Sequence, residues 1–236
     1  MLGGGDPDQM GYLDYRCLRC GEGTHRVAMS CQSSLCRRCA KVSVDTWVSQ
    51  VSQRLHAGVI YRHIGLTVPE LLRQPFYQQA QAVLSPCMRC GARGLDDVCS
   101  RVGGRALQGG SSVVIQTHGR NGRDHPHRPI MATSGGWEPQ AQPWIHRDYV
   151  PYALLRKKWQ WHLLTRLRQT VQTPESRRLV DTCSTRYREG FVTNVQKGEV
   201  PTRYQSVARY LATYVVRPPI SLRRIDRYDG QRVPYH

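Results

Sequence analysis

The segment CLRCGEGTHRVAMSCQSSLCRRC, residues 17 to 39, places five cysteines within 23 residues. They form two pairs of Cys-x-x-Cys spacing with a fifth cysteine between them: Cys17 and Cys20, Cys36 and Cys39, and Cys31. One such loop can wrap two thiolates around a tetrahedral ion, and a second pair completes the coordination shell. The segment therefore predicts a small module held by a structural zinc ion, with the four paired cysteines as ligands.

The ligand set stays open, because Cys31 and His25 are each a substitute for a paired cysteine or an outer-shell group. A set of buried or reactive thiols is the weaker alternative, since such a density of pairs is rare in reduced proteins. A further Cys-x-x-Cys, Cys87 with Cys90, has no partner pair of suitable spacing beside it. There we favour free cysteines on a helix over a second metal site.

Composition narrows the class of partner. The chain has 236 residues and a formal net charge of +17, which favours nucleic acid or an anionic membrane surface. No apolar run of 18 residues and no secretory signal is present, so we expect no membrane partner and a cytoplasmic protein. Basic residues near the cysteines and near the C-terminus are candidate phosphate contacts, with a solvated basic face as the alternative: Arg37, Arg38, Lys41, Arg209 and Arg217.

Hydrophobic periodicity predicts an α+β fold with helices packed on one face of a sheet. Helices are expected at about 44–55, 69–102 (with a break), 151–168, 175–188 and 204–216. Strands are expected at 61–68, 112–117, 127–133 and 190–195, and a hairpin at 222–235. We expect residues 1–58 to form the zinc-binding module and its linking helix, and residues 59–236 to form the main domain.

Two groups of side chains carry candidate chemistry. His118, His125 and His127 flank the turn between two predicted strands, and histidines at i and i+2 on a strand share a face. Tyr210 and Tyr214 lie one helical turn apart, so both phenols can face one site. Each group alone is weak evidence, because solvent-facing histidines and packed tyrosines are common.

Together these motifs give a specific resemblance. The chain resembles the rolling-circle transposases of bacterial insertion sequences, the two-tyrosine branch of the HUH (His-hydrophobic-His) nuclease superfamily. The resemblance covers nearly the whole chain and rests on four segments: the cysteine segment, YRHIGLTVPELLR from Tyr61, VVIQTHGRNGRDHPHRPIMATSGGW from Val113, and RYLATYVVRPPISLRRI from Arg209.

The resemblance implies a ferredoxin-like, antiparallel catalytic sheet that acts on single-stranded or element-end DNA. His127 is implied as a ligand of Mg²⁺ or Mn²⁺, which stabilises charge on the scissile phosphate. Tyr210 and Tyr214 match the two nucleophiles, which form a 5′-phosphotyrosine and later transfer the strand. The oligomeric state and the DNA target do not follow from the sequence.

This chain departs from the family pattern at the second histidine. Pro126 and His127 fit, but Arg128 and Pro129 follow, so a proline stands where the second metal ligand belongs. Proline also removes an N–H from an expected central strand. His125, at i and i+2 from His127, is the candidate substitute, although its register differs. Similar transposases continue beyond this C-terminus, so we expect a truncated copy.

Two rival functions remain at this point. One is a catalytically inactive, zinc-containing DNA-binding remnant of such a transposase. The other is a zinc-ribbon protein that binds RNA or another protein, with the tyrosines merely packed.

Overall fold

The chain divides into two compact units in the computed structural model. The structure describes residues 6–33, 35–101, 106–119, 124–139, 144–147, 150–195, 204–215, 224–227 and 229–234. Residues 1–55 group with residues 208–236, and residues 56–207 form the second unit. The expected division at residue 58 concerns functional domains and stays a prediction. Within the described part of the chain, no helix combines the length and apolarity needed to cross a membrane.

Few of the described residues in the helices and strands of the first unit are buried. It begins with α1 (Pro7–Met10) and an antiparallel hairpin of β1 (Tyr12–Arg16) and β2 (Thr24–Ala28). Every residue of β1 is exposed. The helix α2 (Arg37–Ser52) follows, and α7 (Tyr204–Val215) ends in this unit.

The second unit is built on an antiparallel sheet of five strands. In space the order is β4 (Ser111–Val113), β6 (Asp124–Thr133), β3 (Tyr61–Thr67) and β9 (Thr193–Val195), and β5 (Gln116–His118) also pairs with β6. A two-stranded sheet of β7 (Gly135–Trp137) and β8 (Trp144–His146) lies beyond β6. The expected α+β class with antiparallel sheets is confirmed.

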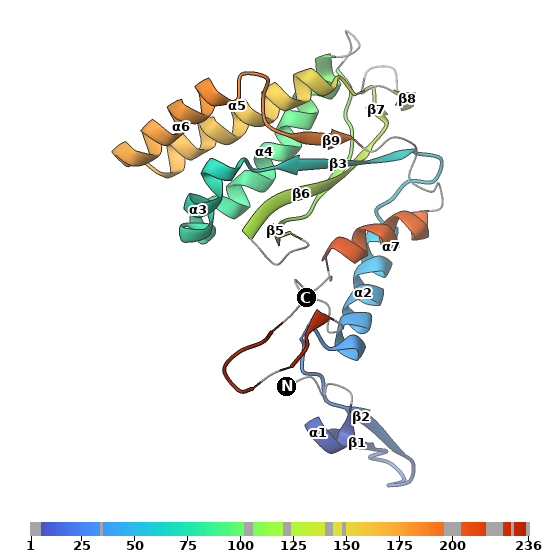
Figure 1. Cartoon of the computed structure of the whole chain (residues 1–236). Coiled ribbons are helices and arrows are strands. Elements are labelled where there is room, and N and C mark those ends of the chain that lie inside the picture. Colours follow the sequence, from blue (N-terminus) through green and yellow to red (C-terminus); the bar gives the residue numbers. More distant parts are fainter. Residues whose placement is uncertain are drawn as a thin grey trace. The chain divides into compact units, whose positions relative to one another are not determined.

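Four helices cover one face of this sheet, as Figure 1 shows: α3 (Glu70–Gln78), α4 (Ala80–Arg101), α5 (Tyr152–Thr170) and α6 (Pro174–Arg186). The covered face follows the period-two alternation of the strands. Ile64 and Leu66 of β3 are buried, as are Ile130 and Ala132 of β6. They pack into one core with Trp159 of α5, which is fully buried and donates its indole N–H to the Thr67 carbonyl at 3.1 Å.

A glycine allows α4 to approach the sheet closely. A Cβ at Gly91 would lie 3.1 Å from Leu66 Cδ1 and 3.3 Å from Ile130 Cδ1, closer than ordinary van der Waals contact. The absence of a side chain at this position therefore allows close packing of the helix on the sheet.

Pro129 of β6 limits the hydrogen bonding of this strand with its neighbour. Val114 donates its N–H to the Pro129 carbonyl at 3.0 Å, but Pro129 has no N–H to return. The predicted strand 112–117 is accordingly interrupted and appears as β4 and β5. Opposite Pro129 on the other side lies Gly65 of β3.

Most other predicted elements are confirmed with shifted ends. The helical region 69–102 divides into α3 and α4 at Gln79, and the strand at 190–195 is shortened to β9. Gly135 and Gly136 begin β7. Of the predicted C-terminal hairpin, the described residues show backbone hydrogen bonds from Asp226 N to Pro234 O (3.0 Å) and from Asp229 N to Arg232 O (3.3 Å), without a regular strand.

Candidate functional site

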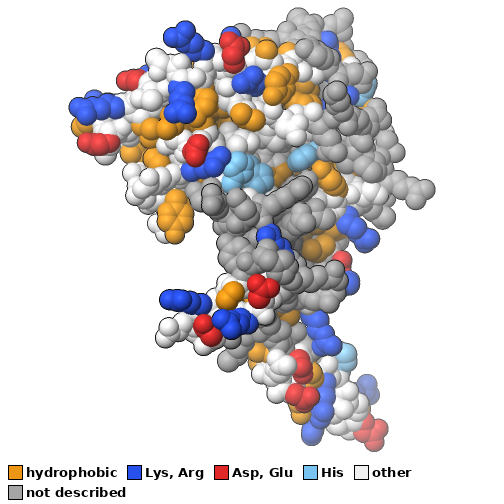
Figure 2. Space-filling view, in the orientation of Figure 1, with side chains coloured by type: hydrophobic (Ala, Val, Ile, Leu, Met, Phe, Trp, Pro, Cys, Tyr) orange, Lys and Arg blue, Asp and Glu red, His pale blue; other side chains and the backbone are white. Residues whose placement is uncertain are grey.

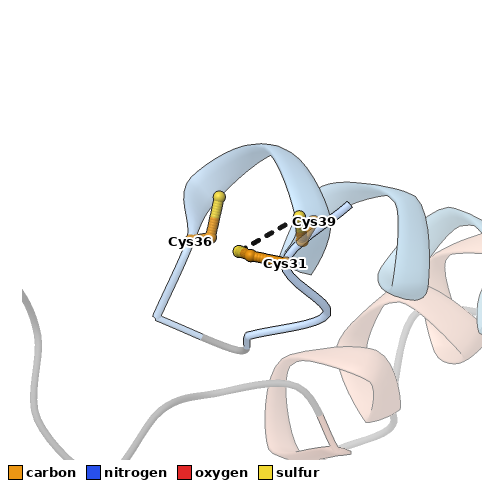
Figure 3. A group of neighbouring side chains, drawn as sticks. All are labelled: Cys31, Cys36 and Cys39. Carbon is orange, nitrogen blue, oxygen red and sulfur yellow. Dashed lines mark hydrogen bonds between the residues drawn. The ribbon is translucent and has the colours of Figure 1, made fainter. Parts of the chain in front are cut away.

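Three cysteines converge at the start of α2. The Sγ atoms of Cys31, Cys36 and Cys39 all lie within 4.8 Å of one another, and Figure 3 shows them pointing into one space. Cys36 caps the N-terminus of α2, and Cys39 lies one turn later, so the helix itself sets their spacing. Zn–S bonds of about 2.3 Å place thiolates of a tetrahedral site about 3.8 Å apart, which fits this group. Cys31 thus joins the predicted pair.

The environment of Cys39 favours the thiolate that zinc requires. The Ser30 hydroxyl donates to Cys39 Sγ at 3.2 Å, and Cys31 Sγ lies 3.5 Å from it. The Ser30 hydrogen bond lowers the pKa of Cys39 to about 7. A thiol ionised near neutral pH is typical of a metal ligand.

The other predicted pair lies in the turn between β1 and β2. Cys17 and Cys20 are exposed, and the Cys17 carbonyl accepts a hydrogen bond from Gly21 N at 2.9 Å. Backbone N–H groups of Cys20 and Arg19 lower the pKa of the Cys17 thiol. The turn therefore also favours a thiolate, although this pair is not part of the converging group. The four-cysteine shell stays a prediction.

Cysteines of the second unit have the opposite character. Cys87 and Cys90 are buried in α4, and burial raises the pKa of Cys87 to about 12 and also raises that of Cys90. Burial likewise raises the pKa of Cys183 to about 11. In the part of the chain that the structure describes, none of them joins a group of three metal-ligating side chains. These properties favour our interpretation of Cys87 and Cys90 as free cysteines on a helix.

His127 lies on the sheet face that the helices leave open. Its neighbour Arg128 faces the helices and is 1% exposed, so the alternation of β6 turns His127 to the other side. In register with His127 are Thr67 of β3 and Gln116 of β5. Three side chains from three strands therefore share a place on this face, and all are half-buried.

The two candidate imidazoles are close together. The His125 and His127 ring centroids are 5.6 Å apart, and His127 Nδ1 lies 2.9 Å from the His125 carbonyl oxygen. Since a carbonyl only accepts, Nδ1 is the donor, and in the neutral form of His127 this tautomer leaves the lone pair on Nε2. Metal-ligating histidines commonly have this arrangement. The side chain of His118 lies outside the described residues.

Arg128 is an uncommon core residue. Its guanidinium lies 4.9 Å from the ring centre of Trp159 and 5.8 Å from that of Phe76. Its Nε and Nη1 are buried and have no hydrogen-bond partner among the described residues. Burial lowers the pKa of the guanidinium. Arg128 thus packs in the core, at the position where the resemblance implies a hydrophobic residue.

The predicted nucleophiles lie on α7. Val207, Ala208, Leu211 and Ala212 are its buried face, and Tyr210 is half-buried. The helix includes Tyr214, whose side chain lies outside the described residues. Both tyrosines belong to the first compact unit and His127 to the second, so their convergence stays a prediction.

The candidate phosphate contacts are only partly visible. Arg38 and Arg209 are exposed on α2 and α7. Lys41 is also exposed and forms an i,i+4 ion pair with Asp45 at 2.6 Å. The side chain of Arg37 and the whole of Arg217 lie outside the described residues.

Comparison with known families identifies both parts of the chain. The family described as "Putative transposase", of the Y2 type, matches residues 110–236, which is more than half of the sequence. The chain belongs to this transposase family. Residues 5–68 match the transposase zinc-binding domain of the IS91 type, so the converging cysteines lie in a zinc-binding segment.

Two curated relatives agree with this assignment. The transposase for insertion sequence element IS801 of Pseudomonas savastanoi pv. phaseolicola is 26% identical over 212 residues, 85% of this chain and 50% of the relative. The putative transposase y4qJ of Sinorhizobium fredii is 28% identical over 130 residues, 55% of this chain and 32% of the relative. The chain therefore spans half or less of the relatives' length. No solved structure matches.

Sequence reasoning missed the polar neighbours of His127. Thr67 and Gln116 are separated from it by 60 and 11 positions along the chain, and only the pairing of β3 and β5 with β6 brings them together. The sequence places Thr67 and Gln116 near the ends of two predicted strands. It does not show which residues of the neighbouring strand they face, because the strand register cannot be read from a local pattern.

Proposed function

We propose that this protein is a transposase that nicks single-stranded DNA at element ends and transfers the strand through a 5′-phosphotyrosine. The observation that carries the proposal is the His125–His127 pair on the open face of the sheet, with ring centroids 5.6 Å apart. Family membership supplies the reaction class, and the net charge of +17 supplies attraction for DNA. A bacterial cytoplasm is the compartment in which this activity and the reduced thiols belong.

His127 Nε2 and the His125 imidazole would hold a divalent cation, Mg²⁺ or Mn²⁺. Gln116, in register with His127, would supply an amide oxygen beside them. Such an ion, when bound, neutralises charge on a non-bridging phosphate oxygen. The hydrogen bond between His127 Nδ1 and the His125 carbonyl fixes the tautomer and orients the ring.

The reaction itself needs one phenol at a time. The oxygen of Tyr210 or Tyr214 loses its proton to solvent or a nearby base and forms a bond to phosphorus, while the bond from phosphorus to the 3′ oxygen breaks. The departing 3′ oxygen takes up a proton. The phosphotyrosine bond preserves the free energy of the phosphodiester bond. In the strand-transfer step a new 3′-hydroxyl therefore attacks the phosphorus, a phosphodiester forms and the tyrosine oxygen leaves. A spacing of four residues along a helix would bring both phenols to the same side of α7.

The zinc-binding segment would clamp the DNA. We assign Cys36, Cys39 and Cys31 to the zinc shell, with a thiolate of the Cys17–Cys20 turn as the fourth ligand. Arg38, Lys41 and Arg209, and with them Arg37 and Arg217, are the candidate phosphate contacts. A closed thiolate shell leaves no open position for substrate, which makes the ion structural.

A covalent-adduct assay tests the nicking activity. Purified protein is incubated with labelled single-stranded ends of its own element and Mn²⁺, then run on a denaturing gel. We expect a protein–DNA band that disappears in the Tyr210→Phe/Tyr214→Phe double variant and in His127→Ala. Tyr77→Phe, on an exposed tyrosine of α3, is the matched control and should keep the band.

The second candidate function is a DNA-binding remnant without cleavage, and Pro129 favours it. Pro129 occupies the place of the second family histidine and has no ligand atom. A missing adduct band with retained DNA binding would support this candidate and refute nicking. Pro129→His then separates two causes: recovery of the band identifies the lost ligand as the defect.

A metal substitution assay tests the zinc ligands. Replacing zinc with Co²⁺ gives thiolate charge-transfer absorption whose intensity rises with the number of sulfur ligands. We expect Cys31→Ser and Cys39→Ser each to reduce this absorption, and Cys87→Ser to leave it unchanged. Undiminished absorption in Cys31→Ser would indicate that the zinc ligands are the two Cys-x-x-Cys pairs and that Cys31 is not one of them.

A further inference from the structure

An open groove lies on the outer side of the helical layer, between α5 and α6. Its volume is about 570 Å³, within the usual range of ligand sites. Because these helices cover the sheet face opposite His127, the groove is separate from the histidine pair. Figure 2 shows Lys and Arg side chains, with a few acidic ones, around a band of apolar surface over α5 and α6.

The lining of the groove is basic. Among the residues that the structure describes, no acidic side chain lines the groove and four cations do: Lys157, Lys158, Arg168 and Arg188. Lys158 and Arg168 pair with Asp97 and Asp181, which lie outside the lining. Lys157 and Arg188 are exposed and make no ion pair with any residue that the structure describes. Two uncommitted charges therefore remain for an anionic partner.

An aromatic side chain stands at the same groove and is held in place. Trp161 is 58% exposed, with the Lys158 ammonium 5.6 Å from its ring centre and the His162 ring edge-on at 4.7 Å. Asp97 binds both supports, Lys158 Nζ at 2.7 Å and His162 Nε2 at 3.2 Å. The carboxylate thus fixes two neighbours of the indole, which lowers the entropy lost when a planar group stacks on it.

We propose that this groove binds a second stretch of single-stranded DNA, away from the strand that is cut. Phosphates would lie against Lys157 and Arg188, and an unpaired base would stack on Trp161. Cations that follow a backbone, beside an exposed aromatic ring, are the combination used for single strands. Duplex DNA offers phosphates but keeps its bases stacked. The identity of the polyanion as DNA rests on the proposed function.

Photo-crosslinking tests the location directly. Full-length zinc-loaded protein is irradiated with a 20-nucleotide oligo(dT) that carries 5-iododeoxyuridine, and the crosslinked peptides are mapped by mass spectrometry. We expect crosslinks at Trp161 with the wild type. Crosslinks confined to other peptides would overturn the proposal, since an occupied groove must place a base beside this ring.

Charge reversal tests the phosphate contacts. We expect Lys157→Glu/Arg188→Glu to bind the oligonucleotide at least tenfold more weakly, and its log-affinity against log-salt slope to fall by about 1.4, or about 0.7 per lost contact. Arg177→Glu/Arg178→Glu, on exposed α6 positions outside the lining, makes the same change in net charge and is the matched control. Equal losses in both double variants would mean general attraction only and would overturn the proposal.

A stacking variant separates the ring from the charges. Trp161→Ala should weaken binding about tenfold, and Trp161→Phe should restore most of it. Undiminished oligonucleotide binding by Trp161→Ala would overturn the assignment. So would a charge-reversal variant that loses binding to phosphatidylserine vesicles but keeps its affinity for the oligonucleotide.

The tests are independent of strand cleavage. Crosslinking and affinity need no nicking, so they report on the groove even if Tyr210 and Tyr214 are inactive. Conversely, the groove variants should still form the covalent adduct when a saturating concentration of element-end DNA is supplied. Loss of the adduct in all proteins, with the groove effects intact, would refute the proposed function alone.

Discussion

The two compact units achieve order by different means. The strand β1 of the first unit has every residue exposed, whereas β3 of the second buries Ile64 and Leu66 against four helices. A hairpin without a buried face gains little from the hydrophobic effect, since that effect scales with apolar area removed from water. We therefore expect the cysteine-rich segment to depend on bound metal for its stability, whereas the sheet domain depends on packing. Each prediction below changes one of these two sources of stability.

Zinc removal should have the largest effect. Structural zinc sites contribute about 10–16 kcal/mol of apparent binding energy in small domains, and this energy is also folding energy. A strong chelator should abolish hydrogen-exchange protection in residues 6–33 and at the start of α2, while β3 and β6 stay protected. Equal loss of protection in the sheet would show that the contrast between the units is wrong.

Truncation of the central core residue should have the next largest effect. Trp159→Ala removes a fully buried indole and its hydrogen bond to Thr67, which we expect to cost about 3–5 kcal/mol in the free energy of unfolding of the sheet domain. Denaturant titration measures it. Zinc content should stay unchanged, and the exposed Trp161→Ala should alter stability by less than about 0.5 kcal/mol.

Replacing the buried cation should stabilise the sheet domain. Arg128→Leu removes a charge whose Nε and Nη1 lack partners among the described residues, and restores a hydrophobic residue beside Phe76 and Trp159. We expect unfolding to cost about 1–3 kcal/mol more, because unsatisfied buried donors are expensive. A fall in the melting temperature would show that the aromatic contacts outweigh desolvation.

A half-exposed ion pair should give the smallest effect. Hydrogen bonding by Lys158, then by His162, lowers the pKa of Asp97 below its usual value. Its stabilising contribution is therefore present above the unfolded pKa near 3.8 and is lost as pH falls through the lower folded value. Asp97→Asn should cost less than about 1 kcal/mol at pH 7, and the difference from wild type should vanish at the acid end of a pH series of melting curves.

The sequence predicted elements better than contacts. The apolar spacing of Val44, Trp47 and Val48 and the alternation through Ile64 and Leu66 depend on local geometry, and α2 and β3 follow them. The helix predicted at 151–168, which includes the apolar Leu155, corresponds to α5 in the structure. Such patterns are set within a few residues, so they need no knowledge of the fold.

The site depended on pairings that no local pattern contains. Gln116 meets His127 through the register of β5 with β6, and Cys31 lies beside Cys36 and Cys39 at the start of α2. Arg128 was noted only as a departure from a motif, because its contacts with Phe76 and Trp159 come from two different helices. Chain topology decides these encounters.

The burial of the cysteines has a consequence for oxidative stress. Cys17 and Cys20 are exposed, and backbone hydrogen bonds lower the pKa of the Cys17 thiol, whereas Cys87 and Cys183 are buried and burial raises their pKa values. Peroxide attacks accessible thiolates first. If the N-terminal segment holds zinc as proposed, a mild oxidant should release the ion while the helix-covered sheet survives, and a thiol reductant should restore zinc binding.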